Sequence, residues 1–238
     1  MGIFNFAILQ FSNKRRIRLN QQIPKSFWCY RFGAYNVLAM KTLVIDSRKI
    51  DGDIIEEAAE VLRSGGIVAH PTDTCYGLAV DIFNEEALKN FYERKGMDFD
   101  KPVSVLVRSL EEAEQYGVFS ELALRLAKEF WPGPLTLVVP RTAAVPSFLN
   151  PKQSDVGLRV ISEPVTVALL NAFGGPVTTT SANAHGEPTP YSLPEISMKT
   201  DFILDAGDLK CSEKPSTVIR IEGDHATVIR QGNLFLDI

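Results

Sequence analysis

The sequence is poor in the residues that build disulfide frameworks and metal sites. Its 238 residues include three cysteines and three histidines, all widely spaced, and no Cys-x-x-Cys pair. Disulfide-rich scaffolds and structural zinc sites need several such residues at short, regular spacings. The sequence therefore indicates neither, and it predicts no metal ligand from the protein. This cysteine usage fits a reducing, cytoplasmic compartment best.

Long apolar runs are also missing. No segment approaches the ~20 consecutive apolar residues of a membrane-spanning helix, so we expect no membrane partner. Hydrophobic residues nevertheless make up 45% of the chain and charged residues 23%, which is ordinary for a globular protein with a sizeable core. The length suits one large domain, or one domain and an extension.

Acidic residues are absent from the first forty positions. This segment carries six Lys or Arg residues and many aromatics, without clear periodicity. It is either a basic leader or an extension upstream of a protein that starts at Met40, and we favour the extension. We therefore predict an N-terminal extension over residues 1–40 and a folded domain over residues 41–238. Because the whole chain has a net charge of −4, the part after the extension carries −10, which argues against unspecific nucleic-acid binding.

From residue 43 onward, short apolar runs alternate with amphipathic stretches. Helices are predicted over residues 51–64, 84–94, 120–130 and 164–173, with a further short helix that starts after Ser109. Strands are predicted over residues 43–45, 67–69, 78–83, 103–107, 135–139, 156–160, 177–180, 202–204, 217–221 and 226–230. The alternation is not strict, so we predict an α/β fold with a mixed sheet and helices on both faces.

The first indication of a ligand site is the stretch from Gly65 to Leu78 (GGIVAHPTDTCYGL). A short apolar strand, 67–69, breaks at Pro71 into a cluster of hydroxyl residues with one acid and one tyrosine. Such a strand places hydrogen-bonding groups at the open end of a sheet, where α/β folds bind their ligands. An ordinary strand–turn–strand is the alternative interpretation.

Other strand ends share this combination of small hydroxyls and single cations. They are VGLRV with Arg159, TTTSAN over 178–183, KPSTVIR with Ser216 and Thr217, VIRQG with Arg230, and the loop flanked by Lys95 and Lys101. Hydroxyls and arginines bind carboxylates and phosphates, and lysine acts as a point charge. No Ser-His-Asp signature, catalytic carboxylate pair or Walker loop stands out. An enzyme of this kind works by positioning and neutralising anions, although each feature also has a purely structural explanation.

Together these motifs resemble the YrdC-like domain of threonylcarbamoyl-AMP synthases. They run in order from GGIVAHPTDTCYGL through Lys95, Lys101-Pro102, WPGPLTLV, VGLRV, TTTSAN and PSTVIR to IRQG, over residues 41–236. The resemblance implies a three-layer fold with a strongly twisted mixed sheet and a concave, cation-lined cleft. It also implies a nucleotidyltransferase that converts L-threonine, bicarbonate and ATP, with Mg²⁺, into threonylcarbamoyl-AMP and pyrophosphate. A downstream threonylcarbamoyl-transferase complex then modifies tRNA. Larger members have an additional C-terminal domain, which we do not expect here.

The resemblance also assigns residues. It gives catalytic roles to Lys95, Arg159 and Arg230. It places Thr72, Thr74, Tyr76, Arg159, Thr179 and Ser216 around threonine. It places Lys95, Lys101, Asp155, Ser181, Asn183, Thr189 and Arg230 around the nucleotide. A carbamate of threonine attacks the α-phosphate in this scheme, both reactants are anions, and the cations offset their repulsion. The loop 185–194 is the candidate lid over this reaction.

One position departs from the family pattern. Where the family usually has Lys-Gly-Arg, this chain has Lys95-Gly96-Met97. The absent arginine removes a charge-assisted contact worth about 1.5–3 kcal/mol, which corresponds to about tenfold or more in turnover. Either Arg94 or Lys101 takes its place, or the protein belongs to a sister branch with another substrate.

Two other classes of function stay open at this point. The same fold could bind structured RNA, tRNA or ribosomal, without catalysis; the basic first forty residues favour this interpretation and the acidic remainder opposes it. Carbamoyl or acyl-adenylate chemistry on another amine is a weaker alternative.

Overall fold

The computed structural model describes residues 41–209 and 214–236, and the predicted extension over residues 1–40 lies outside them. The described strands are β1 (Lys41–Val44), β2 (Val68–His70), β3 (Gly77–Ala79), β4 (Ser104–Val107), β5 (Leu135–Pro140), β6 (Asp155–Val160), β7 (Val177–Ser181), β8 (Phe202–Asp205), β9 (Thr217–Glu222) and β10 (His225–Arg230). The helices are α1 (Gly52–Arg63), α2 (Glu85–Lys95), α3 (Leu110–Tyr116), α4 (Glu121–Phe130) and α5 (Pro164–Phe173), with a short 3₁₀ helix, η2 (Leu193–Glu195). None of these helices combines the length and hydropathy that crossing a membrane requires.

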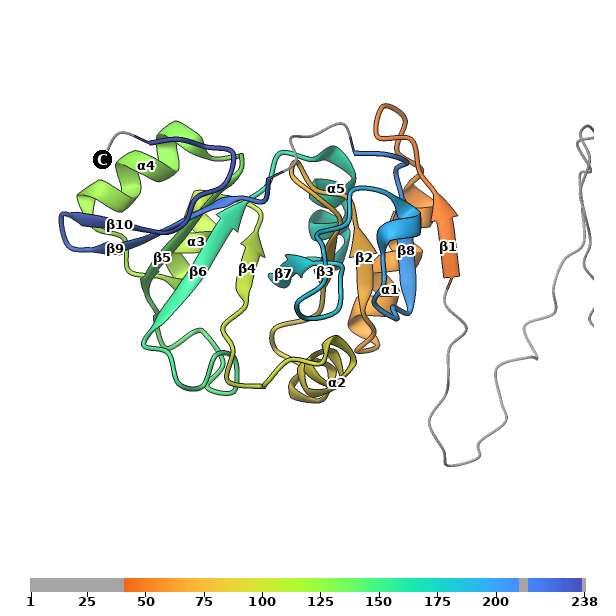
Figure 1. Ribbon diagram of the computed structural model, residues 1–238, viewed down its shortest axis with the longest axis horizontal. Coiled ribbons are helices and arrows are strands. Elements are labelled where there is room, and N and C mark those ends of the chain that lie inside the picture. The colour runs from red at the N-terminus through yellow and green to blue at the C-terminus, as the bar shows by residue number, and fades with distance from the viewer. Residues whose placement is uncertain (1–40, 210–213, 237–238) are drawn as a thin grey trace, which may run out of the picture. The chain divides into compact units, whose positions relative to one another are not determined.

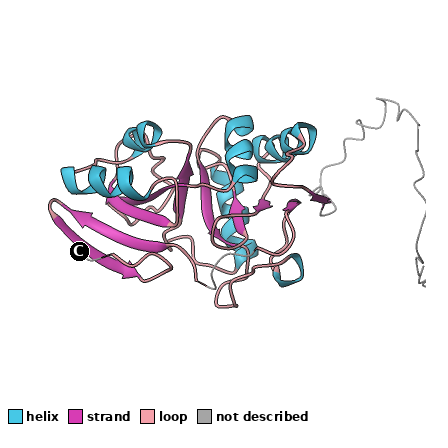
Figure 2. Ribbon diagram, turned by 90° about the horizontal axis from the view of Figure 1, so that it is seen from above, coloured by secondary structure: helices cyan, strands magenta, loops and turns pink. Residues whose placement is uncertain are grey.

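The strands form one mixed sheet in the order β1-β8-β2-β3-β7-β4-β6-β5-β9-β10. The sheet contains parallel pairs, such as β4 with β6 and β5 with β9, and antiparallel pairs, such as β3 with β7 and β5 with β6. Figure 1 shows this order across the molecule, and Figure 2 shows how strongly the sheet twists from one end to the other. The predicted mixed, strongly twisted sheet is confirmed.

Helices cover both faces of the sheet and make it the middle layer of three. On one face, buried side chains of α1 and α5, including Leu62 and Leu169, pack with Val68 of β2. On the other face, α2 and α4 contribute Phe91 and Leu126 to a separate apolar cluster. Strand β8 is buried on both faces, with Phe202 and Ile203 in different clusters, and accordingly reads as the continuous apolar run FIL.

The helix starts follow the capping residues in the sequence. The side chains of Asp51, Asn84 and Ser120 accept hydrogen bonds from backbone N–H groups in the first turns of α1, α2 and α4. Helix α5 begins with Pro164, whose fixed φ suits a first helical turn, and ends at Gly174, whose φ of +83° favours glycine. These four helices therefore lie where the sequence predicts them.

The strand predicted over 78–83 is shorter than expected. Strand β3 ends at Ala79, and Asp81 makes only an isolated bridge to Val177. The carboxylate of Asp81 accepts a hydrogen bond of 2.9 Å from the N–H of Phe83, so the chain turns there and leads into α2. An aspartate that closes its own turn overrides the apolar pattern around it.

Candidate active site

A cavity of about 390 Å³ opens on one face of the sheet. Its wall comes from the loop after β2, from β4, β5, β6, β7, β9 and β10, and from the segment that contains Thr189. This volume lies in the range of small-molecule sites, roughly 300–1,000 Å³. Strand ends that are far apart in the sequence therefore converge on one hollow, as their shared composition predicts.

The two-residue period of a β-strand lets the same strands build both the core and the cavity. On β6, Gly157 and Arg159 line the cavity, while Leu158 between them is fully buried in the apolar core. On β9, Arg220 lines the cavity and Ile219 lies in the core. Polar residues on this face are thus exposed to a ligand without disturbing the packing on the other.

Most of the predicted site residues line this cavity. They are Thr72, Thr74, Asp155, Arg159, Thr179, Ser181, Thr189, Ser216 and Arg230. The remaining four, all within the described residues, lie outside the cavity wall: Tyr76, Lys95, Lys101 and Asn183.

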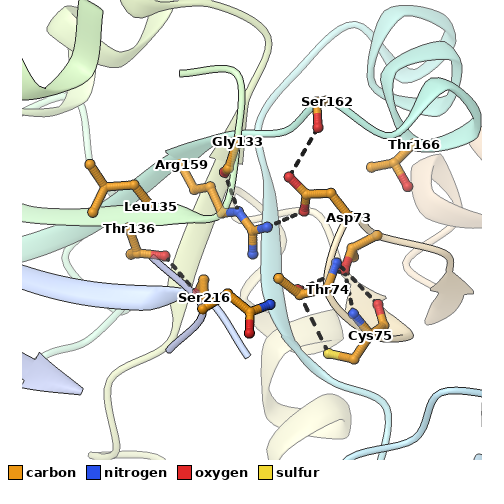
Figure 3. A network of polar contacts seen from close by, with 12 residues as sticks. Asp73, Thr74, Cys75, Gly133, Leu135, Thr136, Arg159, Ser162, Thr166 and Ser216 are labelled. Atoms are coloured by element: carbon orange, nitrogen blue, oxygen red, sulfur yellow. Dashed lines mark hydrogen bonds and ion pairs between the residues drawn. The ribbon is translucent and has the colours of Figure 1, made fainter. Parts of the chain in front are cut away.

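Arg159 is held rigidly at one side of the cavity. Its Nη2 binds the carboxylate of Asp73, and its Nε donates a 3.0 Å hydrogen bond to the carbonyl of Gly133. The other oxygen of Asp73 accepts a 3.1 Å hydrogen bond from the hydroxyl of Ser162 (Figure 3). Burial lowers the pKa of the Arg159 guanidinium and Asp73 opposes that shift, so the side chain stays charged. Asp73 was not among the predicted site residues, although it stands inside the PTDT motif.

The hydroxyl of Thr72 shapes the loop after β2. It accepts hydrogen bonds from the N–H groups of Thr74 (3.0 Å) and Cys75 (2.9 Å) and donates to the carbonyl of Cys75 (2.5 Å). Figure 3 shows Thr74 and Cys75 next to Asp73, whose carboxylate binds Arg159. Thr72 therefore fixes the turn that presents Thr74 to the cavity.

Arg230 and Ser216 form a second pair in the cavity wall. Arg230 donates from Nη2 to the Ser216 hydroxyl (2.9 Å) and from Nε to the Ser216 carbonyl (3.1 Å). The Ser216 hydroxyl lies 3.2 Å from that of Thr136 on β5. Gly232 makes this approach possible, because a Cβ there would lie 2.1 Å from the carbonyl oxygen of Pro215.

Tyr76, which the family resemblance places around threonine, does not line the cavity. Its neighbours Cys75 and Gly77 line the cavity, and the ring of Tyr76 between them points to the other side. Its hydroxyl donates a 2.7 Å hydrogen bond to the carbonyl of Gly207 and accepts one of 3.0 Å from the N–H of Ala206. Burial raises its pKa well above the ordinary value. Tyr76 therefore joins the loop after β2 to the end of β8.

Lys95 lies directly behind the cavity wall. Its Nζ donates to the carbonyls of Ser181 (2.6 Å) and Asn183 (2.8 Å), and 4% of the residue is exposed. Burial lowers the pKa of this ammonium group to about 8. The Asn183 side chain donates to the carbonyl of Glu187 (2.5 Å), and its Oδ1 is buried with no partner among the described residues. Lys95 and Asn183 thus shape the SAN backbone, in place of the direct ligand contact expected from the sequence.

Neither of the cations expected to replace the family arginine faces the cavity. Nζ of Lys101 lies 2.6 Å from Nε2 of His185, and Nη1 of Arg94 binds Asp201 at 3.0 Å. Met97 packs partly buried against the apolar core. The sequence analysis missed Arg220, which lines the cavity and binds Asp155 through Nη2 at 3.0 Å. The spacing of Ser216 and Arg220 in PSTVIR, with period two, was the available signal.

The described residues provide few potential ligands for a metal ion. No group of three or more His, Cys, Asp or Glu side chains in 41–209 and 214–236 is arranged to hold one. Asp155 is the one carboxylate among the described residues of the cavity wall, and it binds Arg220. Mg²⁺ usually binds through substrate phosphates and few protein ligands, so it would enter this site with a phosphate ligand.

Comparison with known families decides the relationship. Residues 60–232 match the family Sua5_yciO_yrdC, described as "Telomere recombination". The chain belongs to this family. Among its relatives, a putative threonylcarbamoyl-AMP synthase of Methanocaldococcus jannaschii is 36% identical over 183 residues, which cover 75% of this chain and 86% of that protein. The threonylcarbamoyl-AMP synthase of Pyrococcus abyssi is 34% identical over 202 residues, which cover 82% of this chain and 59% of that protein.

Solved structures of the Sua5/YciO/YrdC family have the same fold. P. abyssi Sua5 complexed with L-threonine matches with a TM-score of 0.74 at 31% identity, over 81% of this chain and 57% of that chain. E. coli YciO matches with a TM-score of 0.69 at 29% identity, over 81% of this chain and 95% of that one. The predicted family and fold are therefore confirmed, and this chain spans a little more than half of the P. abyssi protein.

Proposed function

We propose that the protein is a threonylcarbamoyl-AMP synthase. It is a nucleotidyltransferase that joins L-threonine, bicarbonate and ATP into threonylcarbamoyl-AMP and releases pyrophosphate. Two relatives with this name, 34% and 36% identical to the chain, support the proposal. The observation that carries it is the cavity, in which Arg159 and Arg230 share one wall with small hydroxyl residues.

Threonine would bind on the Arg159 side. The likeness to a Sua5 complexed with L-threonine supports a threonine site in this fold. Arg159 is clamped by Asp73 and Gly133, so its remaining N–H groups have a fixed direction toward a carboxylate. Thr74, Thr179 and Ser216 line the same cavity and supply hydroxyls for the amine, the side chain or the carbamate.

ATP would bind along Ser181, Thr189 and Arg230. Arg230 meets the phosphates as a guanidinium positioned by Ser216. Lys95 acts on the nucleotide through the 181–183 backbone, whose carbonyls it binds. Mg²⁺ accompanies ATP on its phosphates, where it offsets their charge.

The reaction requires that the two anionic reactants be positioned and that their charges be offset. The threonine amine and bicarbonate condense to a carbamate and release one water, and a carbamate oxygen then forms a bond to the α-phosphorus of ATP. The bond from that phosphorus to the bridging oxygen breaks, and its electron pair leaves with pyrophosphate. Arg159 and Arg230 reduce the repulsion between the two anions, and the segment 185–194 limits access of water to the carbamate and the adenylate. In this scheme the protein supplies no nucleophile.

The product would pass to a threonylcarbamoyl-transferase complex that modifies tRNA, in a reducing cytoplasm. The alternative function, binding of structured RNA without catalysis, has less support, because the cavity has the size of a small-molecule site. Its basic segment, residues 1–40, lies outside the described residues.

A product assay tests the proposal. The protein is incubated with threonine, bicarbonate, magnesium and ATP, and threonylcarbamoyl-AMP and pyrophosphate are measured by mass spectrometry. Both should form only when threonine and bicarbonate are present together, and Arg159→Gln should lower both at least about tenfold. ATP turnover that is indifferent to threonine would reject the function. Deleting residues 1–39 should leave product formation intact; loss of RNA binding without any product in the full chain would favour the alternative.

A further inference from the structure

Three arginines line the cavity, and each has a different partner. Arg159 binds Asp73, Arg230 binds Ser216, and Arg220 binds Asp155. The first two occupy positions that the family resemblance already assigns. Arg220 stands outside that assignment, so its place in the wall needs an explanation of its own.

Strand register places Arg220 at the end of a row of small side chains. Thr179 of β7 pairs with Ser104 of β4, and a Cβ on Gly157 of β6 would lie 2.8 Å from the Ser104 hydroxyl. Val138 of β5 then pairs with Gly157 on one side and with Arg220 on the other. Because no large side chain stands in this row, the cavity floor continues to the guanidinium of Arg220.

The contact between Arg220 and Asp155 leaves the guanidinium incompletely satisfied. One bond, from Nη2 to Oδ2 at 3.0 Å, joins the two side chains. Nε of Arg220 is buried and has no hydrogen-bond partner in the part of the chain that the structure describes. A buried donor without an acceptor destabilises this conformation of the Arg220 side chain. A second conformation becomes favourable when a ligand provides acceptors for the guanidinium. The side chain is 40% exposed, which leaves it room to move.

The exposure of the arginines indicates which anion each one meets. The side chain of Arg159 is 4% exposed and lies deep beside the PTDT turn, where a small carboxylate fits. Arg220 is tenfold more exposed, so a larger anion such as a triphosphate can reach its guanidinium. Asp155 is an unsuitable contact for phosphate oxygens, because two anions repel each other.

We propose that Arg220 is a nucleotide-binding residue, which leaves Asp155 and binds oxygens of the ATP triphosphate when the nucleotide enters. This inference rests on the proposed function. It assigns to Arg220 the contact that Met97 does not make, and it changes the expected role of Asp155 from a nucleotide contact to a competitor that holds Arg220 in the free protein. Threonine remains the ligand of Arg159.

Steady-state kinetics and calorimetric titration with MgATP test the inference on the full chain. The variants are Arg220→Gln, Arg220→Lys, Asp155→Asn and the double variant Asp155→Asn/Arg220→Gln. Arg48→Gln is the matched control, because Arg48 also binds an aspartate, Asp46, and its side chain is 91% exposed. Thermal unfolding of each variant shows whether the fold is retained.

Arg220→Gln should raise the KM and Kd for ATP about tenfold and change the KM for threonine less than about twofold. Arg220→Lys should fall between wild type and Arg220→Gln. Asp155→Asn should tighten ATP binding a few-fold, and only when Arg220 is present. The inference is overturned if Arg220→Gln binds ATP like wild type, or if Asp155→Asn weakens ATP binding equally with and without Arg220. If wild type binds ATP but forms no threonylcarbamoyl-AMP, the proposed function fails, while the ATP titrations still decide the role of Arg220.

Discussion

The carboxylate of Asp73 binds the guanidinium of Arg159 and thereby joins the loop after β2 to strand β6. The two side chains are 14% and 4% exposed. Removing one partner of a buried ion pair leaves the other charge uncompensated, which typically costs about 3–5 kcal/mol. This pair therefore contributes both to the stability of the fold and to the direction of Arg159.

The Asp73→Asn variant tests both contributions. We expect the free energy of unfolding to fall by about 3 kcal/mol and kcat/KM for threonine to fall at least about tenfold. Urea denaturation and product kinetics measure the two effects. Asp46→Asn, which removes the exposed partner of Arg48, is the control and should change neither. Wild-type kinetics in Asp73→Asn would show that Arg159 needs no anchor.

The Ser216 hydroxyl should position Arg230. Ser216→Ala removes the 2.9 Å bond from Arg230 Nη2 and leaves the bond to the Ser216 carbonyl. A charge-assisted hydrogen bond is worth about 1.5–3 kcal/mol, so we expect kcat/KM for ATP to fall about tenfold or more. Ser192→Ala is the control, since the Ser192 side chain makes no capping hydrogen bond to η2. Equal kinetics for the two variants would contradict this role.

Activity should depend on the protonation of Lys95. Burial lowers its pKa to about 8, so the ammonium loses its proton as the pH rises through that value. The hydrogen bonds from Lys95 Nζ to the Ser181 and Asn183 carbonyls are then no longer charge-assisted. We therefore expect kcat/KM for ATP to fall by up to about tenfold per pH unit. In Lys95→Arg this decline should move to higher pH, whereas the exposed Lys89→Arg should leave it unchanged. A wild-type profile that is flat between about pH 7 and 10 would refute the prediction.

Acid should destabilise the fold through His70. This histidine is fully buried; its Nδ1 lies 2.8 Å from the Thr166 hydroxyl, and Nε2 has no partner among the residues that the structure describes. Burial lowers its pKa from 6.5 to about 4. Between these values the unfolded chain binds the proton more readily, so the free energy of unfolding should fall by about 3 kcal/mol as the pH drops through this window.

Urea titrations at several pH values measure this effect. His70→Asn should be less stable than wild type at neutral pH but should show a flatter pH dependence. His225→Asn alters an exposed histidine and should keep the wild-type dependence. The prediction is wrong if His70→Asn loses stability in acid as steeply as wild type does.

Local signals in the sequence predict much of the fold. Capping residues such as Asn84 and Ser120 act on the N–H groups of the next turn, so their effect is readable within a few positions. Most site residues were also predictable, because hydroxyls and arginines cluster at strand ends that meet in the sheet. The match with a known family confirms the fold that these signals indicate.

The sequence analysis differs from the structure where contacts between residues far apart in the chain determine which way a side chain points. Tyr76 and Thr74 are two positions apart, and only the turn between them and the end of β8 determine that Tyr76 points away from the cavity. Lys95 is a cation in a conspicuous motif, which predicts a ligand contact, yet its ammonium group donates to carbonyls more than eighty positions later in the chain. Arg220 lies in a predicted strand, but only the pairing of β9 with β5 determines that its side chain faces the cavity.

Strand β10 joins the sheet last in chain order and brings Arg230 to a wall whose first members belong to the loop after β2. While the chain is still on the ribosome, the Thr72 turn and Arg159 emerge before the hairpin of β9 and β10 exists. A nascent chain that ends before this hairpin lacks part of the cavity wall. Ligand binding therefore cannot yet stabilise the folded domain. Protection by ligand should therefore begin only after the β9–β10 hairpin has left the ribosome and closed.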